Sequence, residues 1–187
     1  MKYISVTMIR SNMDELPACP LPEGYRVRNF ESGDEHNWAN IEAAAGEFNG
    51  DKQMALQRFQ REFMPHPREL ERRCLFLVGA GGRAIGTATA WYNDDFKGGS
   101  YGRLHFVAIH PEYQGRGLGK ALVGAACRKM AGWHTKAYLT SQTTSYIAIN
   151  IYLGYAFEPC LVGDQCREGW GLLAKKLRHP CLGEFLA

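Results

Sequence analysis

Residues 107–120 read Val107-Ala108-Ile109-His110-Pro111-Glu112-Tyr113-Gln114-Gly115-Arg116-Gly117-Leu118-Gly119-Lys120. The stretch passes from an apolar strand into a loop that holds three glycines, and then into an amphipathic helix. Backbone N–H groups in such a loop, together with the unpaired N–H groups at the start of the helix, form a binding site for phosphate. Glycine suits this loop because a side chain would keep the ligand away from the backbone. The sequence therefore predicts a site for a phosphate-bearing ligand.

Two common nucleotide-binding motifs do not fit this loop. The Walker A motif would need glycine at Gln114 and a hydroxyl residue after Lys120, where the chain has Ala121. The dinucleotide-binding motif would need its third glycine at Lys120. The failed Walker A spacing excludes a nucleotide hydrolase. The spacing that the loop does have is Gln114-x-x-Gly117-x-Gly119.

A second motif follows downstream, in Ala148-Ile149-Asn150-Ile151-Tyr152-Leu153-Gly154-Tyr155-Ala156-Phe157. With the glycine loop and its strand, it resembles the GNAT superfamily of acyl-CoA-dependent N-acetyltransferases, in which an Ala precedes a Tyr by four residues and a Gly-Phe pair follows. Here Ala156 replaces that glycine, and Ser145 stands where the family usually has Asn. The specific resemblance covers about residues 84–160, and a weaker order of elements covers nearly the whole chain.

The resemblance implies acetyl-CoA as cosubstrate and no metal. In this family the strands that correspond to residues 104–109 and 136–140 splay apart, and the pantetheine arm lies between them. It pairs there with backbone groups, here those of Val107 and Ile109. The other residues implied to bind the cofactor are Gln114, Gly115, Arg116, Gly117, Gly119 and Lys120 around the pyrophosphate, and Asn150.

The resemblance also implies direct attack of an amine on the thioester. Tyr152 is the expected proton donor to the departing sulfur, because a phenol with a pKa near 10 stays protonated at neutral pH. The oxyanion is expected to meet a backbone N–H near residues 107–109. The usual Glu base is missing, since Arg103 occupies its place. His105, which period two puts on the same face as Val107, is the candidate base, and a chain of water molecules is the alternative.

Three acidic residues lie in the helical segment that shapes the acceptor side in this family: Glu42, Glu47 and Asp51. They are able to attract an ammonium group. We nevertheless interpret them as a solvated helix face, which is the commoner role of such charges.

The remaining pattern predicts one mixed α/β sheet with helices on its faces. Turn signals and apolar periodicity predict strands over 25–30, 74–78, 84–91, 104–109 and 136–140, with an extended segment over 3–10. Helices are expected at about 34–47, 51–63, 117–131 and 144–154, and a closing pair of strands at about 157–163 and 168–176. The resemblance makes this a single domain, residues 1–187, with a mostly antiparallel sheet.

Composition agrees with a globular enzyme. The chain has 187 residues, 45% of them hydrophobic, and a net charge of +3, too small to indicate a nucleic-acid-binding surface. Its six cysteines show no Cys-x-x-Cys spacing, which favours reduced thiols. The sequence has neither the features of a signal peptide nor an apolar run long enough for a membrane helix. We therefore expect a cytoplasmic protein without membrane or nucleic-acid partners.

The sequence thus predicts an N-acetyltransferase that moves an acetyl group from acetyl-CoA to a primary amine of a small molecule or peptide. Two alternatives stay open: a non-catalytic acyl-CoA sensor of the same fold, and an acyltransferase that uses a longer acyl group. Members of the family often dimerise, so a homodimer is also expected. The sequence does not name the acceptor.

Overall fold

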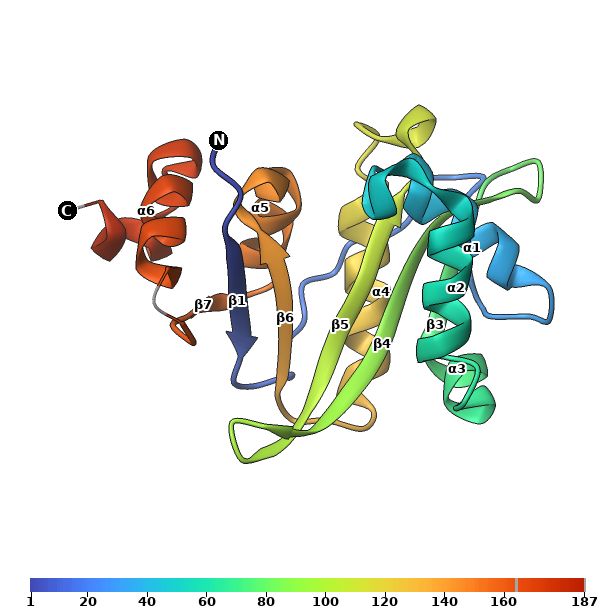
Figure 1. Cartoon of the computed structure of the whole chain (residues 1–187), viewed down its shortest axis with the longest axis horizontal. Helices are drawn as coiled ribbons and strands as arrows, with labels where there is room; N and C mark the ends of the chain where they lie inside the picture. The colour runs from blue at the N-terminus through green and yellow to red at the C-terminus, as the bar shows by residue number, and fades with distance from the viewer. Residues whose placement is uncertain (164, 187) are drawn as a thin grey trace.

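The computed structural model describes residues 1–163 and 165–186. Its centre is a seven-stranded sheet with the order β2-β3-β4-β5-β6-β1-β7 (Figure 1). Neighbouring strands are antiparallel except β5 and β6, which confirms the mixed, mostly antiparallel sheet. The strands are β1 (Ser5–Arg10), β2 (Arg26–Asn29), β3 (Cys74–Val78), β4 (Ala84–Phe96), β5 (Gly99–Ile109), β6 (Ala137–Gln142) and β7 (Glu158–Cys160).

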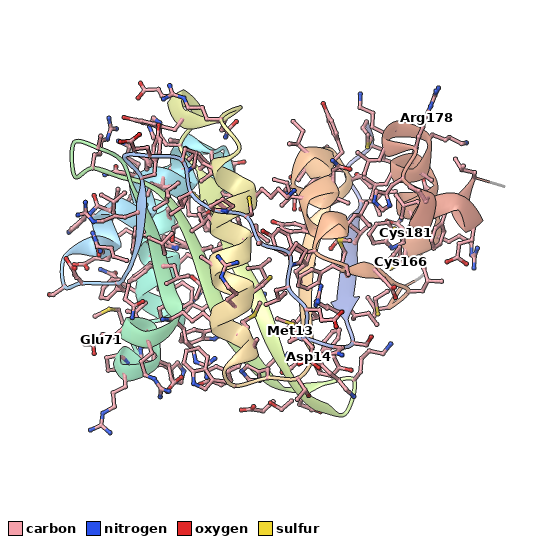
Figure 2. All side chains as sticks on the ribbon, turned by 180° about the vertical axis from the view of Figure 1, so that it is seen from behind. Met13, Asp14, Glu71, Cys166, Arg178 and Cys181 are labelled. Atoms are coloured by element: carbon pink, nitrogen blue, oxygen red, sulfur yellow. The ribbon has the colours of Figure 1, made fainter. Side chains whose placement is uncertain are left out.

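Helices cover both faces of this sheet. In Figure 1, α1 and α2 lie in front of the sheet and α4 lies behind it, and Figure 2 shows α4 from the back. In the part of the chain that the structure describes, no helix is both long and apolar enough to cross a membrane. The helices are α1 (Asp34–Ala44), α2 (Lys52–Glu62), α3 (Pro67–Arg73), α4 (Leu118–Ala131), α5 (Tyr146–Gly154) and α6 (Cys166–Leu177), with short 3-10 helices η1 (Glu47–Gly50), η2 (Pro111–Tyr113), η3 (Thr143–Ser145) and η4 (Pro180–Phe185).

Each face of the sheet has its own apolar core. Behind it, Leu122 of α4 packs with Leu139 of β6 in a core that α5 and α6 complete. In front, Trp38 of α1 and Phe59 of α2, whose ring centroids are 5.2 Å apart, pack with Phe76 of β3. A strand between two cores must be apolar on both sides, which explains why every residue of β3 is buried, as its sequence predicts.

The parallel pair β5–β6 is joined only at its start. Gly102 pairs with Ala137 and Arg103 pairs with Tyr138, and no further pairing of the two strands follows. The strands diverge beyond that point, as the ribbons in Figure 1 show. The splayed strands that the resemblance implies are therefore present, with β5 ending at the glycine loop and β6 leading into η3 and α5.

The first strand of the chain lies inside the sheet. Thr7 of β1 pairs with Thr140 of β6 on one side and with Cys160 of β7 on the other, both antiparallel. Arg10 at the end of β1 is buried and donates hydrogen bonds to the backbone carbonyls of Asn12, Asp14 and Tyr155. The N-terminal segment is thus fixed to the end of α5.

The type of one predicted element was wrong. Residues 168–176, expected to form a strand, lie in helix α6, whose residues Cys166, Trp170, Leu173 and Ala174 form one buried face at helical spacing. An additional short helix, α3, begins at Pro67, because a proline is tolerated in the first turn of a helix. The hairpin of β4 and β5 is also longer than expected and turns between Phe96 and Gly99.

Candidate active site

A cavity of about 560 Å³ opens where β5 and β6 diverge. Its walls come from the end of β5, the glycine loop, the start of α4, the first turns of α5 and the segment between α1 and η1. Segments from both faces of the sheet thus contribute, so the cavity extends from the glycine loop to the acceptor side. A pocket at the carboxyl end of diverging parallel strands is a common ligand site in α/β proteins.

The glycine loop forms one end of this cavity. Gly115 and Gly117 have φ values of 76° and 75°, a left-handed conformation that favours glycine. A Cβ at either position would meet no protein atom within 4 Å, so the space beside the backbone is free for a ligand. Gly117 also caps α4, whose first turn holds no acidic residue. The free N–H groups and the positive end of the helix dipole therefore face this space, which fits a pyrophosphate.

Most of the predicted cofactor residues lie in the cavity wall. Gln114 has a second task, because its Nε2 donates a hydrogen bond to the carbonyl of Ile109 at 2.8 Å and ties the loop to β5. The predicted residues that line the cavity are Val107, Ile109, Gln114, Gly115, Gly117, Gly119 and Lys120, together with Tyr152.

Three predicted site residues lie outside the wall: Arg116, Asn150 and His105. Arg116 is exposed and donates to the hydroxyl of Tyr25 at 3.3 Å and to the carbonyl of Glu112 at 3.0 Å. Asn150 is exposed on α5. The structure gives these two side chains no contact with the cavity.

The position of His105 differs from the expectation. Phe106 has a φ of 48°, and β4 pairs with Ala108 and His105 while skipping the two residues between them, so β5 carries a bulge. The extra residue breaks the alternation of faces. His105 therefore lies on the α2 face of the sheet, opposite to the face of Val107, and the prediction that they share a face was wrong.

On that face, His105 pairs with Glu62 of α2, with 2.5 Å between Nε2 and Oε1. Burial lowers the pKa of His105 to about 4, so the imidazole is neutral at physiological pH and donates Nε2–H to the carboxylate. Burial favours a raised pKa for Glu62, but the hydrogen bond from His105 and the charge of Arg58 outweigh it and lower the pKa to about 2. The neutral imidazole and the carboxylate thus form a hydrogen bond that joins β5 to α2.

Tyr152 forms part of the wall on the α5 side. The residue is buried, and its ring packs against Phe157 with centroids 6.4 Å apart. Burial raises the pKa of its phenol far above the usual value, and the charges of Glu42 and Glu47 act in the same direction. The hydroxyl therefore stays protonated and able to donate over the whole physiological range.

The three acidic residues of the acceptor side have three different environments. Asp51 caps α2, accepting from the backbone N–H of Gln53 at 2.7 Å and of Met54 at 3.1 Å. Glu47 is exposed and lines the cavity. Glu42 is buried, with a pKa raised well above its usual value by burial and by Glu47. The prediction of a solvated helix face was wrong for Glu42.

Sequence reasoning missed the apolar part of the wall at the start of α5. Ile147 and Ile151 both line the cavity, one helical turn apart, and Ile147 is 68% exposed. The available signal was the spacing of four between Ile147 and Ile151 at the start of a helix that follows a strand. Ala45 lines the opposite, acceptor-side wall.

Comparison with known proteins agrees with this geometry. Residues 35–155 match the model of the acetyltransferase (GNAT) family. Mycothiol acetyltransferase of Pseudarthrobacter chlorophenolicus is 30% identical over 148 residues, which are 75% of this chain and 45% of that protein. The mycothiol acetyltransferase of Saccharomonospora viridis is 30% identical over 184 residues, or 90% of this chain and 57% of that one. The chain thus spans about half the length of these curated relatives.

Solved structures share the fold at lower identity. A GCN5-related N-acetyltransferase from Sphaerobacter thermophilus superimposes with a TM-score of 0.63 at 21% identity, over 83% of this chain and 48% of that one. A GNAT-family acetyltransferase from Colwellia psychrerythraea gives 0.63 at 10% identity, over 86% and 55%. These likenesses concern the fold alone.

Proposed function

Since this chain belongs to the acetyltransferase (GNAT) family, we propose that it transfers an acetyl group from acetyl-CoA to a primary amine of a small molecule or peptide. The observation that carries the proposal is the cavity between β5 and β6. It joins a phosphate-binding helix start at one end to a protonated tyrosine and an acidic acceptor side at the other.

The glycine loop supplies the cofactor site. Backbone N–H groups of the loop and of the first turn of α4 bind the pyrophosphate oxygens, and Lys120 adds a positive charge. Because β5 and β6 do not pair beyond Arg103, the backbone of Val107 and Ile109 is free to bond the pantetheine arm as an added strand would. This directs the thioester toward the β5 bulge.

The bulge supplies the donor for the oxyanion. Phe106 and Val107 have no partner residue on β4, so a backbone N–H that regular pairing would occupy is left for the developing negative charge. Such a donor is fixed by the strand before the reaction begins, which is what makes it effective. Tyr152 donates its hydroxyl proton to the departing sulfur.

The amine must lose a proton before it attacks. His105 is poorly placed for this role, because it faces α2 and its Nε2 is engaged by Glu62. Among the residues that the structure describes, none that lines the cavity carries an imidazole, so we favour removal of the proton through cavity water.

Which primary amine this chain acetylates is a question for experiment. The relatives are named mycothiol acetyltransferases. This chain is about 30% identical to them over about half of their length, so their acceptor is one candidate among several. We propose to measure CoA release with acetyl-CoA and a panel of glucosamine, spermidine, a dialanine peptide and the substrate of mycothiol acetyltransferases. A parallel calorimetric titration would measure the affinity for CoA.

The two measurements separate the alternatives. Turnover with at least one amine supports the transferase, and the comparison of acetyl-CoA with hexanoyl-CoA identifies a longer acyl group. Tight CoA binding with no turnover on any amine would favour a non-catalytic sensor. Absence of CoA binding would contradict the proposal altogether.

A further inference from the structure

Glu42 is a buried carboxyl that the scheme above does not use. The residue is 1% exposed, and its Oε1 is buried without a hydrogen-bond partner in the described residues. Burying such a group without a partner destabilises a protein. A residue that breaks the ordinary rules of burial is expected mainly where function requires it.

The position of Glu42 on α1 places it beside the reacting end of the cavity, behind the residues that form its wall. Trp38, Glu42 and Ala45 follow each other at intervals of four and three, so they share one face of the helix. Trp38 packs against Phe106 of the β5 bulge, with ring centroids 4.9 Å apart. Ala45 lines the cavity together with Ala108. Glu42, between Trp38 and Ala45, therefore lies over the bulge where the thioester carbonyl is directed.

The elements packed against α1 provide no cation for Glu42. Helix α1 contacts α2, η1, β4 and β5. The cations of α2 and β5 nearby, Arg58 and Arg103, both pair with Glu62, which also accepts a hydrogen bond from the neutral His105. In the described chain, the only charge that acts on the pKa of Glu42 is the carboxylate of Glu47.

The other titratable groups near Glu42 are neutral acids. The charge of Glu42 acts on the pKa of Tyr152 across the cavity and on that of Cys74 of β3, and burial raises both. Among the residues described, Glu42 thus has the carboxylate of Glu47 near it and no positive charge that acts on its pKa. A cationic ligand would complete this arrangement, and an ammonium group is the cation that an amine acetyltransferase receives.

We propose that Glu42 is the terminal acceptor of the proton that the attacking amine loses, and that Glu42 and Glu47 together select an acceptor that carries an ammonium group. The inference rests on the proposed acetyl transfer. Glu47, at the mouth, attracts the cation, and Glu42 receives the proton through cavity water.

The protons balance as follows. The ammonium displaces the proton that Glu42 holds in the free protein, because a nearby positive charge favours the carboxylate. One N–H proton then passes to this carboxylate, and the amine nitrogen forms a bond to the thioester carbon. The C–S bond breaks, its electron pair goes to sulfur, and Tyr152 gives sulfur a proton. The second N–H proton restores Tyr152. Glu42 keeps the proton that it received, as in the free protein, so one proton leaves to water per turnover, the one that the ammonium displaced.

The test compares Glu42→Gln with the parent, using the panel amine that gives the highest kcat/KM. We expect kcat/KM at neutral pH to fall roughly 10²-fold, since general base catalysis is worth about 10²–10⁴. The loss should shrink above the pKa of the amine, where the amine is neutral in solution, and the affinity for CoA should not change. Glu71→Gln makes the same chemical change on the exposed side of α3, where Figure 2 labels Glu71, outside the residues that line the cavity, and should leave the pH profile unchanged.

A second measurement does not depend on turnover. A carboxyl that keeps its proton when folded and loses it when unfolded makes the free energy of unfolding decrease as pH rises above about 4.5. This decrease should disappear in Glu42→Gln. If the Glu42→Gln variant does not fold, the same measurement is made on Glu42→Met. An equal loss of kcat/KM at every pH, no loss, or an unchanged stability profile would overturn the role of Glu42 and leave the acetyl transfer standing. CoA binding without turnover by the parent would overturn both.

Discussion

Gly117 shows how a single missing side chain controls cofactor binding. In Gly117→Val, the added branches would stand where the pyrophosphate approaches the backbone, although they would touch no protein atom within 4 Å. Two lost hydrogen bonds to a charged group correspond to a decrease in acetyl-CoA affinity of roughly 10²-fold or more. Titration calorimetry of the folded variant measures this effect.

Gly33→Val is the matched control for this prediction. Gly33 also has a positive φ, 97°, also precedes a helix, and has no atom within 4 Å of its added Cβ, but it lies away from the cavity. It should reproduce the backbone strain without the loss of affinity. Unchanged acetyl-CoA binding in Gly117→Val would remove the glycine loop from the cofactor site.

Tyr152 provides the second prediction at this scale. Tyr152→Phe keeps the ring that packs on Phe157 and removes only the hydroxyl. We expect kcat to fall about 10-fold to 10³-fold, a barrier increase of about 1.4–4 kcal/mol, with little change in CoA affinity. Tyr146→Phe, on the same helix but outside the cavity wall, should be nearly silent. Equal kcat of Tyr152→Phe and parent, with chemistry rate-limiting, would show that the phenol only packs.

At the scale of elements, the contact between α4 and the end of α5 depends on Gly124. A Cβ at this position would stand 2.4 Å from the hydroxyl oxygen of Tyr155, which donates a hydrogen bond to the carbonyl of Lys120 at 2.9 Å. Gly124→Ala should therefore destabilise the protein by about 1–3 kcal/mol, the range for overpacking a tight contact. Urea denaturation measures the change.

Gly154→Ala, near the end of α5, is the control for this packing effect. Its Cβ would meet no atom within 4 Å, and its φ is not positive, so alanine should be neutral or slightly stabilising there. A destabilisation of equal size in both variants would mean that contact with Tyr155 does not explain the result, since alanine raises helix propensity at both positions.

At the scale of the whole molecule, Glu62 joins helix α2 to strand β5 and makes the free energy of unfolding depend on pH. It binds Arg58 of its own helix at 2.5 Å, and His105 and Arg103 of β5. Its pKa is about 2 in the fold against an ordinary 4.5, so its contribution is complete above about pH 4.5 and is lost as pH falls toward 2. Glu62→Gln should be less stable than the parent by about 1–3 kcal/mol at neutral pH, allowing for partial exposure.

The two stability curves should converge as the pH falls from about 4.5 to about 2, because the parent then loses the same interaction. Unfolding in urea at a series of pH values tests this, with Glu71→Gln as an exposed control. A difference between parent and Glu62→Gln that stays constant with pH would assign the effect to packing.

Local patterns in the sequence determined the strand, glycine loop and helix of residues 107–131 and the helix that carries Tyr152. Each rests on interactions between residues close in the chain, such as free N–H groups at a helix start or apolar spacing along one face. These patterns were enough to identify the family and the cavity wall that the glycine loop and the end of β5 form.

Only the tertiary structure decided the remaining features. Residues 168–176 are a helix because their apolar side meets β1, a strand from the opposite end of the chain. The bulge at Phe106 turns His105 away from the cavity, and no local sequence pattern predicts one extra residue in a strand. The sequence around Glu42 is typical of an acidic residue on a helix surface, and only the packing of α1 against the sheet buries it. Burial, bulges and strand order depend on contacts between distant segments, which the spacing of neighbouring residues does not encode.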